Sequence, residues 1–237
     1  MIKFQKFIKL SLLFMIVAGL FSCNKDDGAE PFSVIGDVIV LKKTFDGEVK
    51  YANSYIAWGT QPMTMAKVVT PYGPEYQLEA LSEAKNTYAK EPGNSDFSAA
   101  TPTEGNYHFL VVHQDISHDV ADLLIFDDID TTEIASVLIA NQVISVQWES
   151  NSDADNFVVR LVNTSGGLTF VSQTLSKEQK RLDFSPGTSG AWQETPVIGE
   201  NYQVELLAIR YEDITDAEDL SYHIQEISIG QQTVTWE

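Results

Sequence analysis

The chain has 237 residues, and its 34 acidic side chains outnumber its 15 lysines and arginines, which gives a formal net charge of −19. A hydrophobic content of 43% and an aromatic content of 11% predict a folded protein and argue against a disordered one. The acidity argues against nucleic acid and anionic lipid headgroups as partners, because phosphate groups would repel the protein.

The first 22 residues have the pattern of a secretory signal. Lys3, Lys6 and Lys9 are followed by an apolar run from Leu10 to Phe21. A basic start followed by a short apolar run is typical of a signal peptide. The run is shorter than the roughly 20 residues that span a bilayer comfortably. We therefore predict that residues 1–22 form a signal peptide.

Cys23 is the only cysteine of the chain and directly follows this segment. Leu20-Phe21-Ser22-Cys23 resembles a lipobox, the cleavage and lipidation motif of bacterial lipoproteins. That resemblance implies a diacylglycerol and an N-acyl chain on Cys23, which together suffice for stable membrane anchoring. The alternative is a chance cysteine after an ordinary signal peptide.

The residues after Cys23 predict a short polar tether, residues 23–33. The sequence Asn24-Lys25-Asp26-Asp27 resembles the start of Bacteroidota surface lipoproteins. This resemblance implies a lipid anchor in the outer membrane, with the protein facing the cell exterior.

From Val34 onward the apolar residues mostly alternate, which is typical of β-strands. Val38, Val40 and Lys42 are expected on one face of the first strand, and Ile39 and Leu41 on the other. Strong strand patterns recur at 157–162 and 202–208. Residues 76–90 leave two possibilities open, a short helix or an irregular crossover.

Two segments of the chain follow one plan. Residues 101–107 and 195–202 both read Thr-Pro, a spacer with Gly, and then Asn-Tyr at the start of an alternating strand. A tryptophan lies upstream in each copy, Trp58 and Trp148. Ordered repetition of this kind indicates a duplicated domain. We place the units at 34–138 and 139–237.

The second unit resembles a fibronectin type III domain. Residues 143–148 match its tryptophan-bearing strand, 153–159 the next loop and strand, and 196–208 the corner and sixth strand. The first unit matches less well and is similar to this family or to an immunoglobulin-like relative. The resemblance implies an all-β fold of two tandem antiparallel β-sandwiches. Tyr107 and Tyr202 are expected to hydrogen-bond back to the backbone while their rings close the cores.

Dense oxygen ligands suggest weak calcium candidates in two places. The first is Asp127, Asp128 and Asp130, and the second is the loop 151–156. Neither has the glycine and terminal glutamate of an EF-hand loop. No zinc motif and no second cysteine accompany the four histidines, so we expect no cofactor.

No nucleophile elbow, phosphate loop or dinucleotide fingerprint is present, and we expect a protein that is not an enzyme. Three aromatic residues in Pro/Gly loops are ligand-binding candidates: Trp192, Tyr72 and Tyr76. Aromatic faces stack on sugars and often anchor ligands. For Trp192 the alternative is that it closes the open end of the sandwich.

These features favour a lipid-anchored, non-catalytic binding or adhesion module, with a glycan or host glycoprotein as ligand. The alternative is a structural spacer or accessory subunit whose partner is another envelope protein. A hydrolase would need a cleft with convergent carboxylates. Fold class alone does not decide between these functions.

Overall fold

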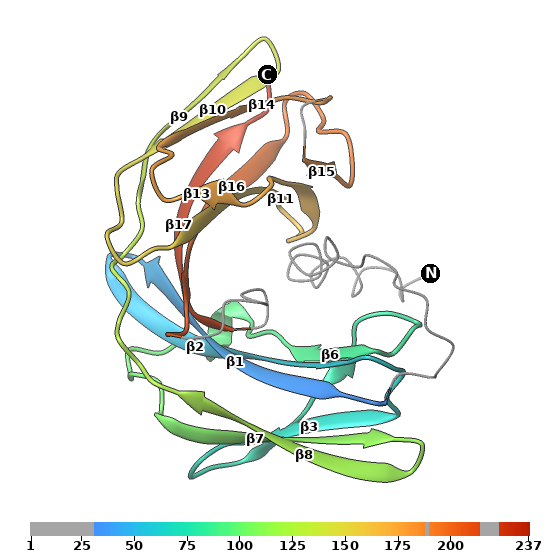
Figure 1. Cartoon of the computed structure of the whole chain (residues 1–237). Helices are drawn as coiled ribbons and strands as arrows, with labels where there is room; N and C mark the ends of the chain where they lie inside the picture. Colours follow the sequence, from blue (N-terminus) through green and yellow to red (C-terminus); the bar gives the residue numbers. More distant parts are fainter. Residues whose placement is uncertain (1–30, 188–189, 214–222) are drawn as a thin grey trace.

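The computed structural model describes residues 31–187, 190–213 and 223–237, and its regular structure is almost entirely β-strand (Figure 1). The predicted signal peptide, Cys23 and most of the tether lie outside the described residues. Within these ranges the single helix is a short 3-10 turn, η1 (Asn94–Asp96). None of the described helices is long and apolar enough to cross a bilayer.

The first lobe is a sandwich of two sheets. One sheet contains β1 (Val34–Phe45), β2 (Glu48–Gly59), β5 (Glu79–Ala80) and β6 (Thr87–Lys90). The other has the order β4-β3-β7-β8 and contains β3 (Met65–Val69), β4 (Glu75–Gln77), β7 (Gly105–His113) and β8 (Ile116–Leu124).

The second lobe repeats this arrangement. Its smaller sheet has the order β14-β10-β9, with β9 (Ile134–Ala140), β10 (Val143–Trp148) and β14 (Arg181–Phe184). Its larger sheet contains β11 (Asn156–Asn163), β12 (Leu168–Val171), β13 (Leu175–Ser176), β15 (Ala191–Trp192), β16 (Asn201–Tyr211) and β17 (Ile224–Thr235). The prediction of an all-β fold with two tandem antiparallel β-sandwiches is confirmed. The division between 138 and 139 stays a prediction, and it falls within β9.

One sheet runs through both lobes. The first half of β17 pairs in parallel with β1, with Val40 opposite Glu226 and Lys43 opposite Ile229. The resulting ten-stranded sheet has the order β15-β12-β11-β16-β17-β1-β2-β6-β5, with β13 paired to β11. Figure 1 shows β17 running from the first lobe to the C terminus in the second. Backbone hydrogen bonds between β1 and β17 therefore fix one lobe against the other.

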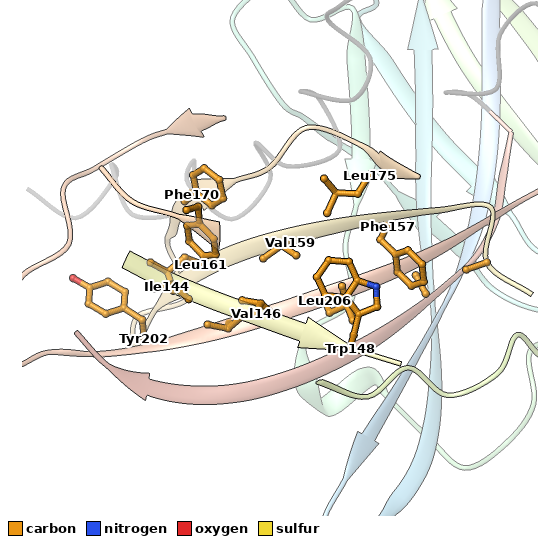
Figure 2. Close-up of a cluster of buried hydrophobic side chains, with 14 of the residues drawn as sticks. Ile144, Val146, Trp148, Phe157, Val159, Leu161, Phe170, Leu175, Tyr202 and Leu206 are labelled. Carbon is orange, nitrogen blue, oxygen red and sulfur yellow. The ribbon is translucent and has the colours of Figure 1, made fainter. Parts of the chain in front are cut away.

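Each sandwich has its own core, built from the inward faces of alternating strands. In the second lobe, Trp148 on β10 packs against Phe157 on β11, with ring centroids 5.7 Å apart (Figure 2). In the first lobe, β1 and β7 approach so closely that a Cβ on Gly36 would lie 2.2 Å from the Phe109 ring. A larger residue at 36 would therefore push the sheets apart. Burying such side chains stabilises each lobe by about 1.5–3 kcal/mol per large apolar residue.

The two corner tyrosines behave as the sequence predicts. The Tyr107 hydroxyl donates to the carbonyl oxygen of Thr103 at 2.7 Å, and its ring is buried in the first core. The Tyr202 hydroxyl accepts from the backbone N–H of Val197 at 2.9 Å, and its ring is buried in the second core. The repeated Asn-Tyr pattern thus marks the same position in both lobes.

The segment 76–90 forms strands instead of a helix. It contributes the end of β4, then β5 and β6, and β6 pairs with β2 through Ile56 opposite Ala89. Thr87, Tyr88 and Ala89 are all buried. Of the two possibilities that the sequence left open, the structure excludes the helix, because β2 offers a free edge whose backbone groups this segment satisfies.

Candidate functional site

An aromatic groove lies on the first lobe, around the connection between β3 and β4. It has a volume of about 410 Å³, and its lining includes Tyr51, Tyr55, Tyr72, Tyr76, Lys90 and Asp96. Volumes of about 300–1,000 Å³ are usual for small-molecule sites. The groove brings together the two predicted residues Tyr72 and Tyr76 with aromatic residues of β2.

The position of Tyr72 follows from the loop that carries it. Lys67, Val68 and Val69 of β3 pair with β4, so residues 70–74 form the turn between them. Two prolines restrict this turn, and the Thr70 hydroxyl lies 3.3 Å from the carbonyl oxygen of Pro74. The turn leaves Tyr72 90% exposed, as an aromatic face with almost no protein contact.

Tyr76 forms the floor of the groove. Its ring stacks on that of Tyr55, with centroids 5.6 Å apart and planes 20° apart. The Lys90 ammonium group lies 5.2 Å from the centre of the Tyr76 ring. Burial raises the pKa of Tyr55 to about 12, so its hydroxyl stays protonated at neutral pH. The groove therefore combines aromatic faces, hydroxyl groups and one cation.

Trp192 lies in the other lobe and is part of that lobe's packing. Its backbone pairs with Phe170, and its half-buried ring lies 4.7 Å from the Phe170 ring and 6.2 Å from the Phe184 ring. This packing corresponds to the alternative in which Trp192 closes the end of the sandwich. The sequence grouped it with Tyr72 and Tyr76, but the structure does not place it in their groove. A ligand-binding role for Trp192 stays a prediction.

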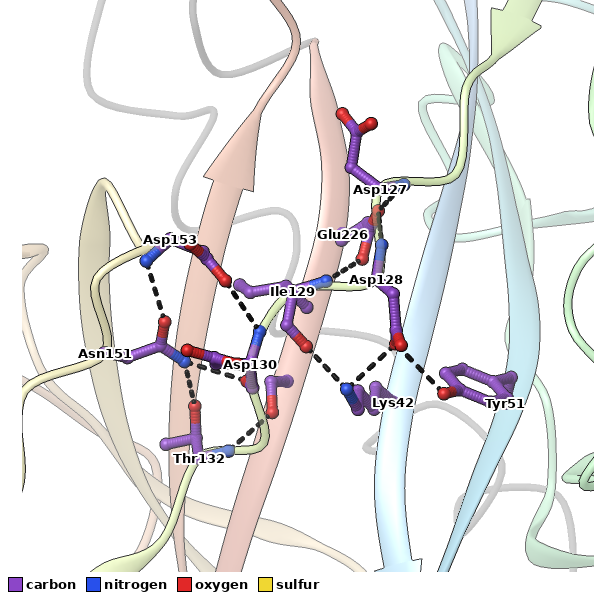
Figure 3. A network of polar contacts seen from close by, with 11 residues as sticks. Lys42, Tyr51, Asp127, Asp128, Ile129, Asp130, Thr132, Asn151, Asp153 and Glu226 are labelled. Carbon is purple, nitrogen blue, oxygen red and sulfur yellow. Dashed lines mark hydrogen bonds and ion pairs between the residues drawn. The ribbon is translucent and has the colours of Figure 1, made fainter.

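The acidic segment 127–130 connects the lobes, and the carboxylates of Asp127 and Asp128 bind basic side chains. Figure 3 shows the contacts of Asp128 with Lys42 and Tyr51. The Lys42 ammonium group donates to Asp128 at 2.9 Å and to the carbonyl oxygen of Ile129 at 2.7 Å. Arg210 donates to Asp127 at 3.0 Å. Partial burial raises the pKa of Asp128, but hydrogen bonds from Lys42 and Tyr51 outweigh it and leave that pKa below its usual value.

A buried carboxylate holds the backbone of the same segment. Glu226 on β17 accepts from the N–H groups of Asp127, Asp128 and Ile129 at 2.8, 3.1 and 2.7 Å. Asn151 donates to the carbonyl oxygen of Asp130 at 2.8 Å. The two weak calcium candidates, the 127–130 segment and the 151–156 loop, thus bind each other and β17. Among the described residues, neither of these two segments contains a cluster of three groups that could hold a metal ion.

A third group of acids brings together residues that the sequence analysis did not single out. Asp37 on β1, Asp122 on β8 and Glu212 after β16 each place a carboxylate oxygen within 4.8 Å of the others. Burial, followed by the charges of Asp122 and Glu212, raises the pKa of Asp37 well above its usual value. Burial also raises the pKa of Asp122, and burial and the Asp122 charge raise that of Glu212. One sequence signal was available, an aspartate inside an otherwise apolar strand.

Comparison with known proteins found no matching family model and no matching curated protein. Among solved structures, a two-domain fibronectin type III segment of chicken tenascin is 13% identical, with a TM-score of 0.29, and the match covers 76% of this chain and 92% of that chain. A DUF3823 family protein from Bacteroides uniformis is 8% identical, with a TM-score of 0.33, over 85% of this chain and 100% of that chain. A segment of chicken CNTN1 with the domains FN1–FN3 is 9% identical, with a TM-score of 0.29, and the match covers 85% of this chain and 64% of that chain.

Proposed function

We propose that this protein is a lipid-anchored, non-catalytic binding module that presents the aromatic groove of its first lobe to a polysaccharide at the cell surface. The observation that carries the proposal is the groove around Tyr72 and Tyr76. The signal pattern and Cys23 support the anchor and the location.

The chemistry of the groove suits a carbohydrate. A sugar ring has an apolar C–H face that packs on an aromatic ring, and hydroxyl groups that need hydrogen-bond partners. Tyr72 offers a free ring face, and Tyr55, which carries a hydroxyl group, lines the same groove. Asp96 and Lys90 add a charged acceptor and a charged donor at the groove. A flat peptide-binding surface would not need this combination.

The converging carboxylates of the protein do not line this groove. Asp37, Asp122 and Glu212 are absent from its lining, where Asp96 is the carboxylate among the described residues. Glycoside hydrolysis uses two carboxylates that flank the bond to be broken. This separation supports binding without hydrolysis.

The test is affinity electrophoresis of the full chain, purified in a non-ionic detergent, through gels that contain individual polysaccharides, together with a glycan array. Tyr72→Ala is expected to weaken retardation by about tenfold, because one lost stacking contact is worth about 1–1.5 kcal/mol. Ile198→Ala is the matched control, since Ile198 is an exposed apolar residue of the second lobe. The circular dichroism spectrum of both variants should be unchanged.

Trp192→Ala separates the two candidate positions. We expect it to lower stability by about 2–3 kcal/mol through lost packing on Phe170 and Phe184, with retardation unchanged. Loss of glycan binding in Trp192→Ala, with Tyr72→Ala unaffected, would move the site to the second lobe. Absence of retardation by every polysaccharide would contradict the glycan proposal.

Exposed apolar side chains along β8, an edge strand of its sheet, favour a second candidate, the accessory subunit of an envelope complex. Ile116, Leu123 and Ile125 lie on or directly after β8, and each is more than half exposed. Exposed apolar side chains at a sheet edge often mark a protein partner. Leu123→Lys should then abolish co-purification of that partner after cross-linking in the native envelope, whereas Tyr72→Ala should not.

A further inference from the structure

Three carboxylates from distant parts of the chain converge at the junction between the lobes. Asp37 and Asp122 belong to β1 and β8 of the first lobe, and Glu212 follows β16 of the second. One oxygen of each lies within 4.8 Å of the others. Since β1 pairs with β17, this cluster lies where the sheets of both lobes meet.

The buried member of the cluster is incompletely bonded. Asp37 is only 7% exposed, and its Oδ1 atom has no hydrogen-bond partner in the described part of the chain. Its carboxylate faces those of Asp122 and Glu212. A buried carboxylate oxygen without a partner is costly, because it has lost its water without replacement. A cation bound between the three side chains would give this oxygen a partner.

The protein provides little positive charge to this cluster. Among the residues that the structure describes, neither lysine nor arginine forms an ion pair with any of the three acids, and His223 Nδ1 lies 3.4 Å from Glu212. Asp122 accepts a hydrogen bond from the backbone N–H of Val38 at 2.7 Å. Burial raises the pKa of all three carboxyl groups, and the charges of neighbouring acids raise the pKa of Asp37 and Glu212 further.

We propose that Asp37, Asp122 and Glu212 form a calcium site that connects the two lobes. Two oxygens bound to one Ca²⁺ at 2.3–2.6 Å lie at most about 5 Å apart, so one ion can contact all three carboxylates. Ca²⁺ takes six to eight oxygens in flexible geometry, and water would complete the coordination. Zn²⁺ prefers nitrogen and sulfur ligands in a tetrahedron, and Mg²⁺ demands near-ideal octahedral geometry.

Bound calcium would hold the end of β16 against the first lobe. The backbone N–H of Glu212 donates to the carbonyl oxygen of His223 at 2.9 Å, so Glu212 is fixed to the start of β17. An ion shared with Asp37 and Asp122 therefore connects the β16–β17 pair to both β1 and β8. The ion stabilises the relative position of the two lobes, independently of any ligand in the aromatic groove.

The test uses the full chain, purified in detergent, stripped with EDTA and titrated with CaCl2. We expect one site by calorimetry, and a rise in Tm of about 5–10 °C when calcium reaches a hundred times its Kd. Glu212→Gln and Asp122→Asn should lose this shift and weaken binding at least about tenfold. Asp128→Asn is the matched control from the other acidic region and should keep the full response.

Terbium luminescence gives a readout that does not depend on stability. Tb³⁺ replaces Ca²⁺ at oxygen sites, and Tyr211 next to Glu212 should sensitise its emission. The emission should be weaker in Glu212→Gln. In the wild-type protein it should fall when added Ca²⁺ displaces Tb³⁺. No calcium heat and no sensitised emission in the wild-type protein would overturn the site. A response to Zn²⁺ alone, or an equal loss in Asp128→Asn, would also overturn it.

Discussion

Two acidic regions lie at the junction between the lobes, and they differ in how their negative charge is balanced. In the segment 127–130, Lys42 and Arg210 pair with Asp128 and Asp127, and Glu226 accepts three backbone N–H groups. In the cluster of Asp37, Asp122 and Glu212, the protein supplies one histidine at 3.4 Å. The region that is acid-rich in sequence is neutralised by the fold, and the region that is inconspicuous in sequence is not.

This difference shows why local acid density is a poor guide to a cation site. Carboxylates that follow each other in sequence often face different neighbours, and here Asp128 binds Lys42 whereas Asp127 binds Arg210. A cation site needs carboxylates that share one small volume and lack another positive partner. Mutations in the two regions should therefore have different sizes and even different signs.

The largest effect is expected in the balanced region. Glu226→Ala should lower the free energy of unfolding by about 3–5 kcal/mol, because three backbone N–H groups at the junction lose their acceptor in a buried position. Guanidinium unfolding measures this change. Glu133→Ala, an exposed acid close to the same segment, is the control and should change stability by less than about 0.5 kcal/mol. Equal effects of the two variants would show that the Glu226 contacts contribute nothing.

A change of opposite sign is expected in the unbalanced cluster. In calcium-free buffer at neutral pH, Asp37→Asn should raise the free energy of unfolding by about 1–2 kcal/mol. The substitution replaces a buried carboxylate beside Asp122 and Glu212 with a neutral amide, which can donate an N–H to them. Thermal unfolding with and without EDTA checks this. If Asp37→Asn lowered stability in calcium-free buffer, the three carboxylates would not repel one another in the way proposed.

Asp128→Asn tests the balanced region at a single exposed acid. Asp128 is about half exposed, so solvent screening limits the expected loss to about 1 kcal/mol or less at neutral pH. Its pKa is lower in the folded state than the usual value, so its contribution is present above about pH 4 and is lost as the pH falls through the folded pKa. Unfolding curves of wild type and variant should converge in acid. If the difference in stability between wild type and variant grew at acid pH, ionised Asp128 would destabilise the fold, contrary to this prediction.

The smallest effect is expected for Asp130. Its carboxylate has no ion pair among the described salt bridges, and its contacts are made by its backbone, which binds Asp153 and Asn151. Asp130→Ala should therefore change stability by less than about 0.5 kcal/mol in chemical unfolding. A loss comparable with that of Asp128→Asn would mean that its side chain also supports the junction.

Prediction from the sequence worked where the signal is local. Alternation from Val34 onward predicted Val38 and Val40 on one face of the first strand and Ile39 on the other, and the structure places them in two different clusters accordingly. At the repeated Asn-Tyr corners the tyrosine hydroxyl binds the backbone in both lobes, donating to Thr103 in the first and accepting from Val197 in the second. At 76–90 the sequence left a helix and an irregular crossover open, and the free edge of β2 decided the conformation. For Trp192 it left ligand binding and closure of the sandwich open, because a Gly/Pro-rich loop looks the same whether or not its aromatic residue packs on a core.

The sequence by itself predicted most strands and the tyrosine corners, since each depends on a pattern within about ten neighbouring residues. The internal repeat added the two units. Tertiary structure alone decided that β17 pairs with β1, because this contact joins the edges of two sheets whose strands lie far apart in the chain. The same pairing decided which acids meet. Asp127 and Asp128 reach Arg210 and Lys42, whereas Asp37, Asp122 and Glu212 are left to share one another's charge.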